Sequence, residues 1–136
     1  MSWTNLLAVA GGGALGASTR YGVNLLFVRH GWYGLPAATF AVNAIGCFLA
    51  GLLLVWLDTR LHDAVWWRNL LMVGFLGGLT TFSALGVEGF QLLRANRIDL
   101  FAWTMLAHVG IGVLAVSVGW KLGQMTFVHR QLRSMA

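Results

Sequence analysis

The sequence predicts an all-α integral membrane protein with four transmembrane helices. Of its 136 residues, 58% are hydrophobic and 10% are charged, and that charged fraction is less than half of what a soluble domain carries. The apolar residues form four runs, each reaching the roughly 20 residues that a helix needs to cross the hydrocarbon. The loops between them are short, so residues 1–136 are expected to form a single membrane domain.

The predicted spans cover about residues 3–27, 34–57, 66–93 and 100–123. The first is kept as a span rather than a secretory signal, because no Lys or Arg precedes it, it is too long and it shows no clear cleavage pattern. The seven tryptophans lie at or near segment ends, as in an interfacial aromatic belt. The net charge of +5 does not indicate nucleic acid, because no basic stripe runs along an exposed helix.

The distribution of basic residues predicts no single orientation in the membrane. With four spans, both termini and the second loop share one side, which carries five Lys or Arg residues against three on the other. The five are Arg60, Arg68, Lys121, Arg130 and Arg133, and the three are Arg29, Arg94 and Arg97. Since Lys and Arg bias sets topology, this small difference fixes no orientation and is compatible with insertion both ways.

The first span carries Gly12 and Gly16, whose spacing lets membrane helices approach closely. Arg20 follows near the end of the same run. Buried ionisable residues in membranes are rare and usually functional, and an arginine at a pore mouth would attract anions. The alternative is that Arg20 snorkels to the interface.

The second span carries Thr39, Asn43 and Gly46 on one helix face, because i, i+4 and i+7 coincide in an α-helix. Such a polar stripe faces protein or water rather than lipid. The amide of Asn43 offers two donors that suit an anion, or it makes an interhelical hydrogen bond. Cys47, the single cysteine, is interpreted as a small buried apolar residue.

The third span contains Gly77-Gly78 followed by Thr80-Thr81, which predicts a break in the helix near the bilayer midplane. Bare backbone at that depth is costly unless it lies in protein or lines a wet cavity, so a break marks a candidate ion or substrate site. Glu88 follows within the same span. It either lines or braces the pathway, or is a hydrogen-bonded or protonated carboxyl near the segment end.

The fourth span places Thr104 and His108 on one face, at i and i+4. His108 is interpreted as an interhelical partner or as part of a polar track. No second His, Cys or carboxylate lies around it at metal-ligand spacing, which argues against a transition-metal site. No catalytic dyad or triad is found, so no enzyme activity is expected.

Three motifs in series resemble the Fluc/CrcB family of bacterial fluoride channels, over about residues 3–125. They are Gly12-Gly-Ala-Leu-Gly-Ala-Ser-Thr-Arg-Tyr21, Thr39-Phe-Ala-Val-Asn-Ala-Ile-Gly46 and Gly74-Phe-Leu-Gly-Gly-Leu-Thr-Thr-Phe-Ser83. The resemblance implies a multi-pass protein of the inner (plasma) membrane that passively exports fluoride and so gives fluoride resistance. It also implies an antiparallel, dual-topology homodimer with two fluoride pores lined by both subunits.

The resemblance assigns roles to particular residues. A structural sodium ion is expected at the dimer centre, held by the backbone carbonyls of Gly77 and Thr80. The pore phenylalanine corresponds to Phe82, the pore amide to Asn43 and the vestibule arginine to Arg20. Ser83 and Thr39 add hydroxyls to the pore, and a further polar track is expected. That track comprises Glu88, Thr104 and His108.

The chain departs from the family at Leu85, where a second pore phenylalanine is common. Leucine fills space but lacks the positive edge of an aromatic ring, so a one-ring pore is expected. Two other functions compete. A proton-coupled small multidrug-type transporter shares the size and topology, but relies on a glutamate in the first span, where this chain has Arg20. A membrane scaffold would leave the predicted break unexplained.

Overall fold

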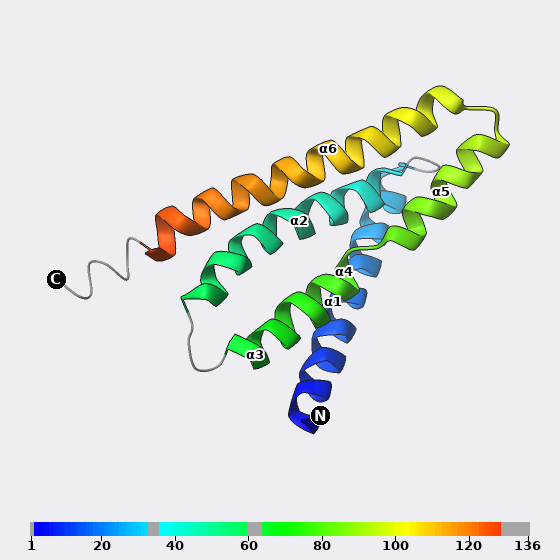
Figure 1. Cartoon of the computed structure of the whole chain (residues 1–136). Coiled ribbons are helices and arrows are strands. Elements are labelled where there is room, and N and C mark those ends of the chain that lie inside the picture. Colours follow the sequence, from blue (N-terminus) through cyan, green and yellow to red (C-terminus); the bar gives the residue numbers. More distant parts are fainter. Residues whose placement is uncertain (1, 33–35, 60–63, 129–136) are drawn as a thin grey trace.

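The computed structural model describes residues 2–32, 36–59 and 64–128, and all the regular secondary structure in these ranges is helical (Figure 1). The elements are α1 (Trp3–Arg29), α2 (Ala37–Asp58), α3 (Ala64–Trp67), the π-helical η1 (Arg68–Leu76), α4 (Gly77–Leu79), α5 (Phe82–Arg94), α6 (Ile98–Gly123) and the π-helical η2 (Gln124–Val128). The prediction of an all-α protein is confirmed. Three of the basic residues counted above lie outside the described residues: Arg60, Arg130 and Arg133.

Among the described residues, three helical segments are long and apolar enough to cross a membrane, judged by length and composition. They are Ala37–Asp58 with 22 residues, Val65–Arg94 with 30 and Ile98–Phe127 with 30. Helix α1 has 27 residues and is therefore long enough at 1.5 Å per residue. Its composition is more polar, because Ser18, Thr19 and Arg20 interrupt the apolar run.

Two close helix pairs organise the fold. In Figure 1, α2 and α6 run side by side, and α1 packs along α3, η1 and α4. Glycines make the α2–α6 contact possible, because an added Cβ at Gly51 would overlap the Val116 carbonyl, and one at Gly119 would overlap that of Phe48. Between the pairs, Val42, Leu76 and Leu79 form a buried apolar cluster.

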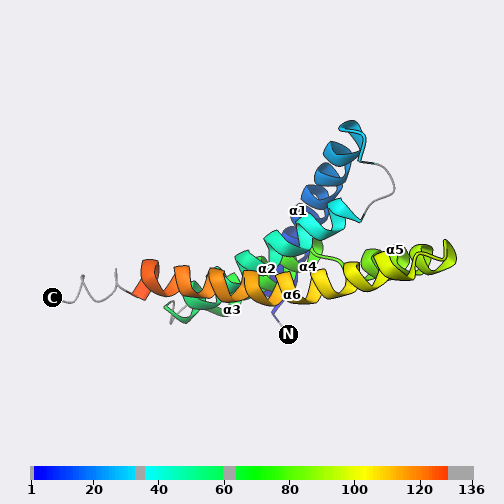
Figure 2. The ribbon, with the colours of Figure 1, turned by 90° about the horizontal axis from the view of Figure 1, so that it is seen from above.

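Helix α5 leaves this arrangement and packs against the first part of α6. A Cβ at Gly89 would lie 3.1 Å from both Phe101 and Met105, so the small residue lets the two helices meet. Seen from above, α5 and α6 lie together at one end while α1 diverges from them (Figure 2). The apolar side chains of α5 are therefore largely uncovered within one chain.

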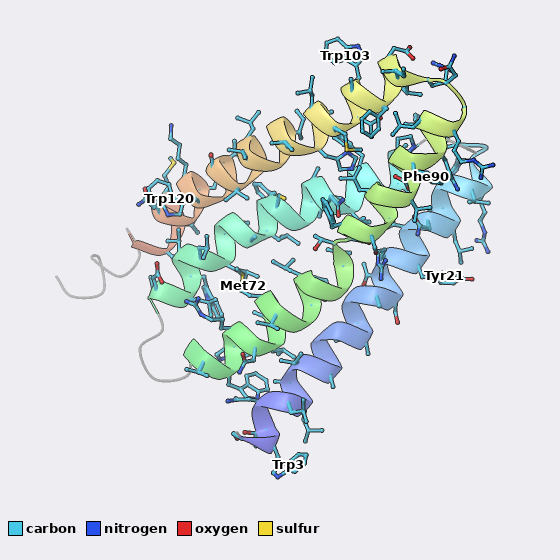
Figure 3. All side chains as sticks on the ribbon, turned by 45° about the vertical axis from the view of Figure 1, so that its right-hand side comes forward. Trp3, Tyr21, Met72, Phe90, Trp103 and Trp120 are labelled. Atoms are coloured by element: carbon cyan, nitrogen blue, oxygen red, sulfur yellow. The ribbon has the colours of Figure 1, made fainter. Side chains whose placement is uncertain are left out.

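Tryptophans mark the helix ends. Trp3, Trp103 and Trp120 point outward near the ends of α1 and α6 (Figure 3), with exposed fractions of 79%, 70% and 44%. Their placement matches the predicted aromatic belt. Met72 instead lies inside, between η1 and α2 (Figure 3), and packs against the buried apolar cluster.

Candidate functional site

Two residues with extended backbone separate α4 from α5. Thr80 has φ −82° and ψ 158°, and Thr81 has φ −153° and ψ 121°. The preceding Gly77 keeps helical angles of −63° and −34°, so the glycine pair does not itself leave the helix. Gly78 serves close packing instead, since a Cβ there would lie 2.5 Å from the carbonyl oxygen of Gly13 on α1, whereas nothing lies within 4 Å of a Cβ added at Gly77.

The side chain of Asn43 binds both backbone groups of Thr81, its N–H and its carbonyl oxygen. The Thr81 N–H donates to Asn43 Oδ1 at 2.8 Å, and Asn43 Nδ2 donates to the Thr81 carbonyl at 3.1 Å. One amide thus replaces the two helical hydrogen bonds that the extended residue has lost. Asn43 therefore makes an interhelical hydrogen bond, and only its second Nδ2 proton remains for an anion.

Thr81 also begins α5. Its hydroxyl accepts a hydrogen bond from the Ala84 N–H at 3.1 Å and lies 3.1 Å from Ser83 Oγ. This is the N-cap geometry in which a Thr side chain satisfies a free amide of the first turn. The exposed Ser83 hydroxyl is thereby tied to the start of α5.

Backbone carbonyls before α5 lose their usual donors because of these two contacts. In a continuous helix, the Thr81 N–H would bond Gly77 and the Ala84 N–H would bond Thr80. Both N–H groups are taken by side chains instead, from Asn43 and from Thr81 itself. Within the described residues, no backbone N–H donates to the carbonyl oxygens of Gly77 or Thr80 across the extended pair. These oxygens are the kind of ligand that hard cations take.

Arg20 reaches the same region from α1. Its Nε donates to the carbonyl oxygen of Gly78 at 3.1 Å, across 58 positions in the sequence. The residue is partly buried, and the contact is a charge-assisted hydrogen bond to a carbonyl that has no helical donor. Arg20 is therefore a neighbour of the extended segment and does not simply snorkel away from it.

The predicted polar face of α2 does face protein. Thr39 donates to Glu88 Oε1 on α5 at 2.5 Å, Asn43 holds Thr81, and a Cβ at Gly46 would overlap the side chain of Thr80. Three positions on one helix face thus meet α5 and the residues before it. Glu88 accepts a hydrogen bond, as the interpretation of a hydrogen-bonded carboxyl expects. Its second oxygen, Oε2, is buried and has no partner among the described residues.

Thr104 and His108 share a face of α6, as their spacing predicts. His108 Nδ1 lies 2.9 Å from the Thr104 carbonyl of its own helix, and its ring meets Phe40 edge-on with centroids 5.1 Å apart. Both residues line a mostly apolar hollow of about 330 Å³ between α2 and α6. His108 Nε2 is buried without a partner among the described residues.

Two of the candidate pore positions on α5, Phe82 and Leu85, have opposite surroundings. The Phe82 side chain is 85% exposed, whereas Leu85 is 7% exposed. Phe90 lies further along the same helix, 61% exposed (Figure 3). The single chain therefore presents the Phe82 ring outward and keeps Leu85 inside.

Sequence reasoning missed the part played by Thr81 and Gly78. Thr81 accepts from Ala84 three residues later, a spacing that is typical of an N-cap and was a usable signal. The Gly78 carbonyl had no such signal, because its partner Arg20 is remote in sequence. Among the described residues, no group of three or more His, Cys, Asp or Glu side chains is placed to hold a metal.

Known proteins resemble the chain over nearly its whole length. A family model described as "CrcB-like protein, Camphor Resistance (CrcB)" matches residues 7–120. A protein of Xylella fastidiosa named "Fluoride-specific ion channel FluC" is 42% identical over 122 residues, which cover 89% of this chain and 91% of that protein. A protein of the same name from Chloroflexus aurantiacus is 40% identical over 121 residues, covering 88% and 95%. One from Agrobacterium fabrum is 37% identical over 123 residues, covering 90% and 98%.

Proposed function

We propose that this chain, which belongs to the CrcB family, is a fluoride-selective channel that lets fluoride leave the cytoplasm passively. The relatives' names supply the ion. The observation in this chain that carries the proposal is the extended Thr80–Thr81 backbone held by Asn43 inside an apolar helical segment of 30 residues. Irregular backbone in such a segment is tolerated where it serves a pathway or lies within protein.

The channel is a multi-pass membrane protein, and we place it in the inner (plasma) membrane with α1 as a fourth span. Three segments qualify by composition, and α1 matches them in length. Its polar residue Arg20 is directed to the Gly78 carbonyl, which removes part of the cost of a charged side chain in a span. The activity is ion permeation and involves no catalysis. A fluoride path of this kind would give fluoride resistance.

Two chains are proposed to form the channel, as an antiparallel dual-topology homodimer. Phe82 has 85% of its surface exposed in the single chain, and an aromatic side chain of a conduction path needs a second wall. Val87 and Phe90 on the same helix are exposed by 57% and 61%. The small Lys and Arg bias of the loops supports insertion in both orientations.

A structural sodium ion is proposed at the dimer centre, with the carbonyl oxygens of Gly77 and Thr80 as this chain's ligands. The donor chemistry fits, because both oxygens lack their helical N–H donors and hard cations take oxygen ligands. The sodium would supply fixed positive charge at the centre of the assembly. The role of this chain would be to keep the carbonyl oxygens of Gly77 and Thr80 free of backbone N–H donors.

The proposed fluoride path is a series of weak donors. The Phe82 ring edge, the second amide proton of Asn43 and the Ser83 hydroxyl lie on or next to the extended segment. Arg20 draws anions to the vestibule, and Thr39 and the buried Leu85 complete the wall. Several weak contacts replace the ion's water without trapping it. We propose that Glu88, which accepts from Thr39, and the Thr104–His108 pair on α6 supply the further polar track.

Fluoride release from liposomes tests the proposal. Purified protein is reconstituted, and release is followed with a fluoride electrode and then repeated with chloride. We expect fast fluoride release and no chloride release. Equal release of both ions, or none from well-assembled protein, would contradict the proposal. Proton-driven efflux of a lipophilic cation would support the small multidrug-type transporter instead.

A further inference from the structure

We infer that Arg20 is a positioning residue: by holding the Gly78 carbonyl, it sets the place of the Gly77 and Thr80 carbonyls that flank it in the chain. The direct observation is the 3.1 Å hydrogen bond from Arg20 Nε to the Gly78 oxygen. The inference rests on the proposed sodium site. It assigns Arg20 a role separate from attracting anions at the vestibule.

Close packing of α1 brings Arg20 to this backbone. Gly12, Gly16 and Arg20 follow one another at i+4 spacing and share one face of α1. An added Cβ at Gly12 or Gly16 would overlap the carbonyls of Leu70 and Phe75 in η1. The two backbones therefore approach closely enough that a side chain one turn later reaches a main-chain oxygen.

The Arg20 contact selects among the carbonyls that the extended pair leaves free. The Gly78 oxygen, like those of Gly77 and Thr80, has no backbone donor within the described residues. The guanidinium occupies it, and a carbonyl already bonded to a cationic donor is a poor ligand for a metal cation. The oxygens of Gly77, Leu79 and Thr80 remain without a backbone donor among the described residues, and those of Gly77 and Thr80 are the proposed sodium ligands.

Asn43 and Arg20 hold the segment from two different helices. Asn43 on α2 bonds Thr81, after the free carbonyls, and Arg20 on α1 bonds Gly78, between them. With both contacts made, the path of residues 77–81 is determined at two points. If the Arg20 contact is lost, only the Asn43 contact still holds the segment.

The charge of Arg20 gives the inference a sign that can be tested. Among the residues that the structure describes, no carboxylate pairs with Arg20, since the recorded ion pair is Arg97 with Asp99. A nearby positive charge by itself repels a metal cation. A purely electrostatic effect therefore predicts that neutralising Arg20 strengthens sodium binding, whereas a positioning role predicts that it weakens sodium binding.

The test measures the melting temperature of the purified assembly as sodium chloride replaces N-methyl-D-glucamine chloride at constant ionic strength. A ligand of the folded state raises the melting temperature. We expect Arg20→Gln to need about tenfold more sodium for the same rise, the size expected for loss of one charge-assisted hydrogen bond. The matched control is Arg29→Gln, at the exposed end of the same helix, which should behave as the wild type.

Arg20→Lys separates geometry from charge. Lysine places a methylene group where arginine has Nε, so the charge stays while the observed donor is lost. If Arg20→Lys needs more sodium for the same rise in melting temperature, the positioning role is supported. This result is informative even if Arg20→Gln does not assemble. An unchanged or stronger response in an assembled variant, or a wild type with no sodium response, would overturn it. Fluoride release by the wild type is measured separately, so failure of the channel proposal is recognised independently.

Discussion

Asn43 and Thr81 form a reciprocal pair in which one side chain satisfies both backbone groups of one residue, at 2.8 and 3.1 Å. The pair joins α2 to the residue that begins α5. It explains how two residues remain extended between helices without unsatisfied polar groups on Thr81. It also diverts an N–H from Gly77, which leaves that carbonyl free.

Replacing Asn43 with Ala should disrupt this arrangement. Both backbone groups of Thr81 lose their partner, which costs about 1–3 kcal/mol for each buried group that stays unsatisfied. We expect a lower melting temperature and at least a tenfold loss of fluoride release. Asn24→Ala, at an exposed position of α1, is the control. Wild-type release from Asn43→Ala would show that the amide is dispensable for the path.

Gly16→Ala should destabilise the contact between α1 and η1. Its Cβ would overlap the Phe75 carbonyl and lie 2.8 Å from the Leu79 nitrogen, and backbone atoms cannot rotate away. Overpacking of this kind costs about 1–3 kcal/mol, measured as a fall in melting temperature in detergent. Gly11→Ala is the matched control, because nothing lies within 4 Å of its added Cβ. Equal stability of the two variants would refute this close approach.

Thr39→Val should leave Glu88 without its donor. The hydroxyl bonds Glu88 Oε1, while Oε2 is buried and has no partner among the described residues. A buried carboxyl with no hydrogen bond costs about 1–3 kcal/mol or more, so we expect lower thermal stability. The control is Thr19→Val. The Thr19 hydroxyl donates to the Leu15 carbonyl within an exposed turn of its own helix, so its loss should change the melting temperature little. The prediction fails if both variants melt at the wild-type temperature.

Phe82→Ala should reduce fluoride release while assembly persists. The ring is exposed in the single chain and contributes little to its core, so its loss should act on the path and leave the fold intact. We expect at least a tenfold slower release from liposomes. Phe90→Ala, on the same exposed helix, tests whether any aromatic ring of α5 has this effect. Equal loss in both variants would argue for a general interface role.

The sequence by itself determined the class of the protein, the rough bounds of its helices and the polar face of α2. These features depend on local patterns: apolar runs long enough for a bilayer and i+4 spacing on a helix. The spacing of Thr39, Asn43 and Gly46 was sufficient to predict that the face meets protein or water, and its contacts with Glu88, Thr81 and Thr80 are with protein.

The tertiary structure alone decided where the chain leaves the helix and what holds it there. The predicted break included Gly77–Gly78, yet both residues stay helical and Gly78 packs on α1, while Thr80–Thr81 are extended. The π-helical winding of η1 also had no sequence signal. The reason is that the deciding hydrogen bonds join residues 38 and 58 positions apart, and no local pattern specifies which distant side chain reaches a given backbone group.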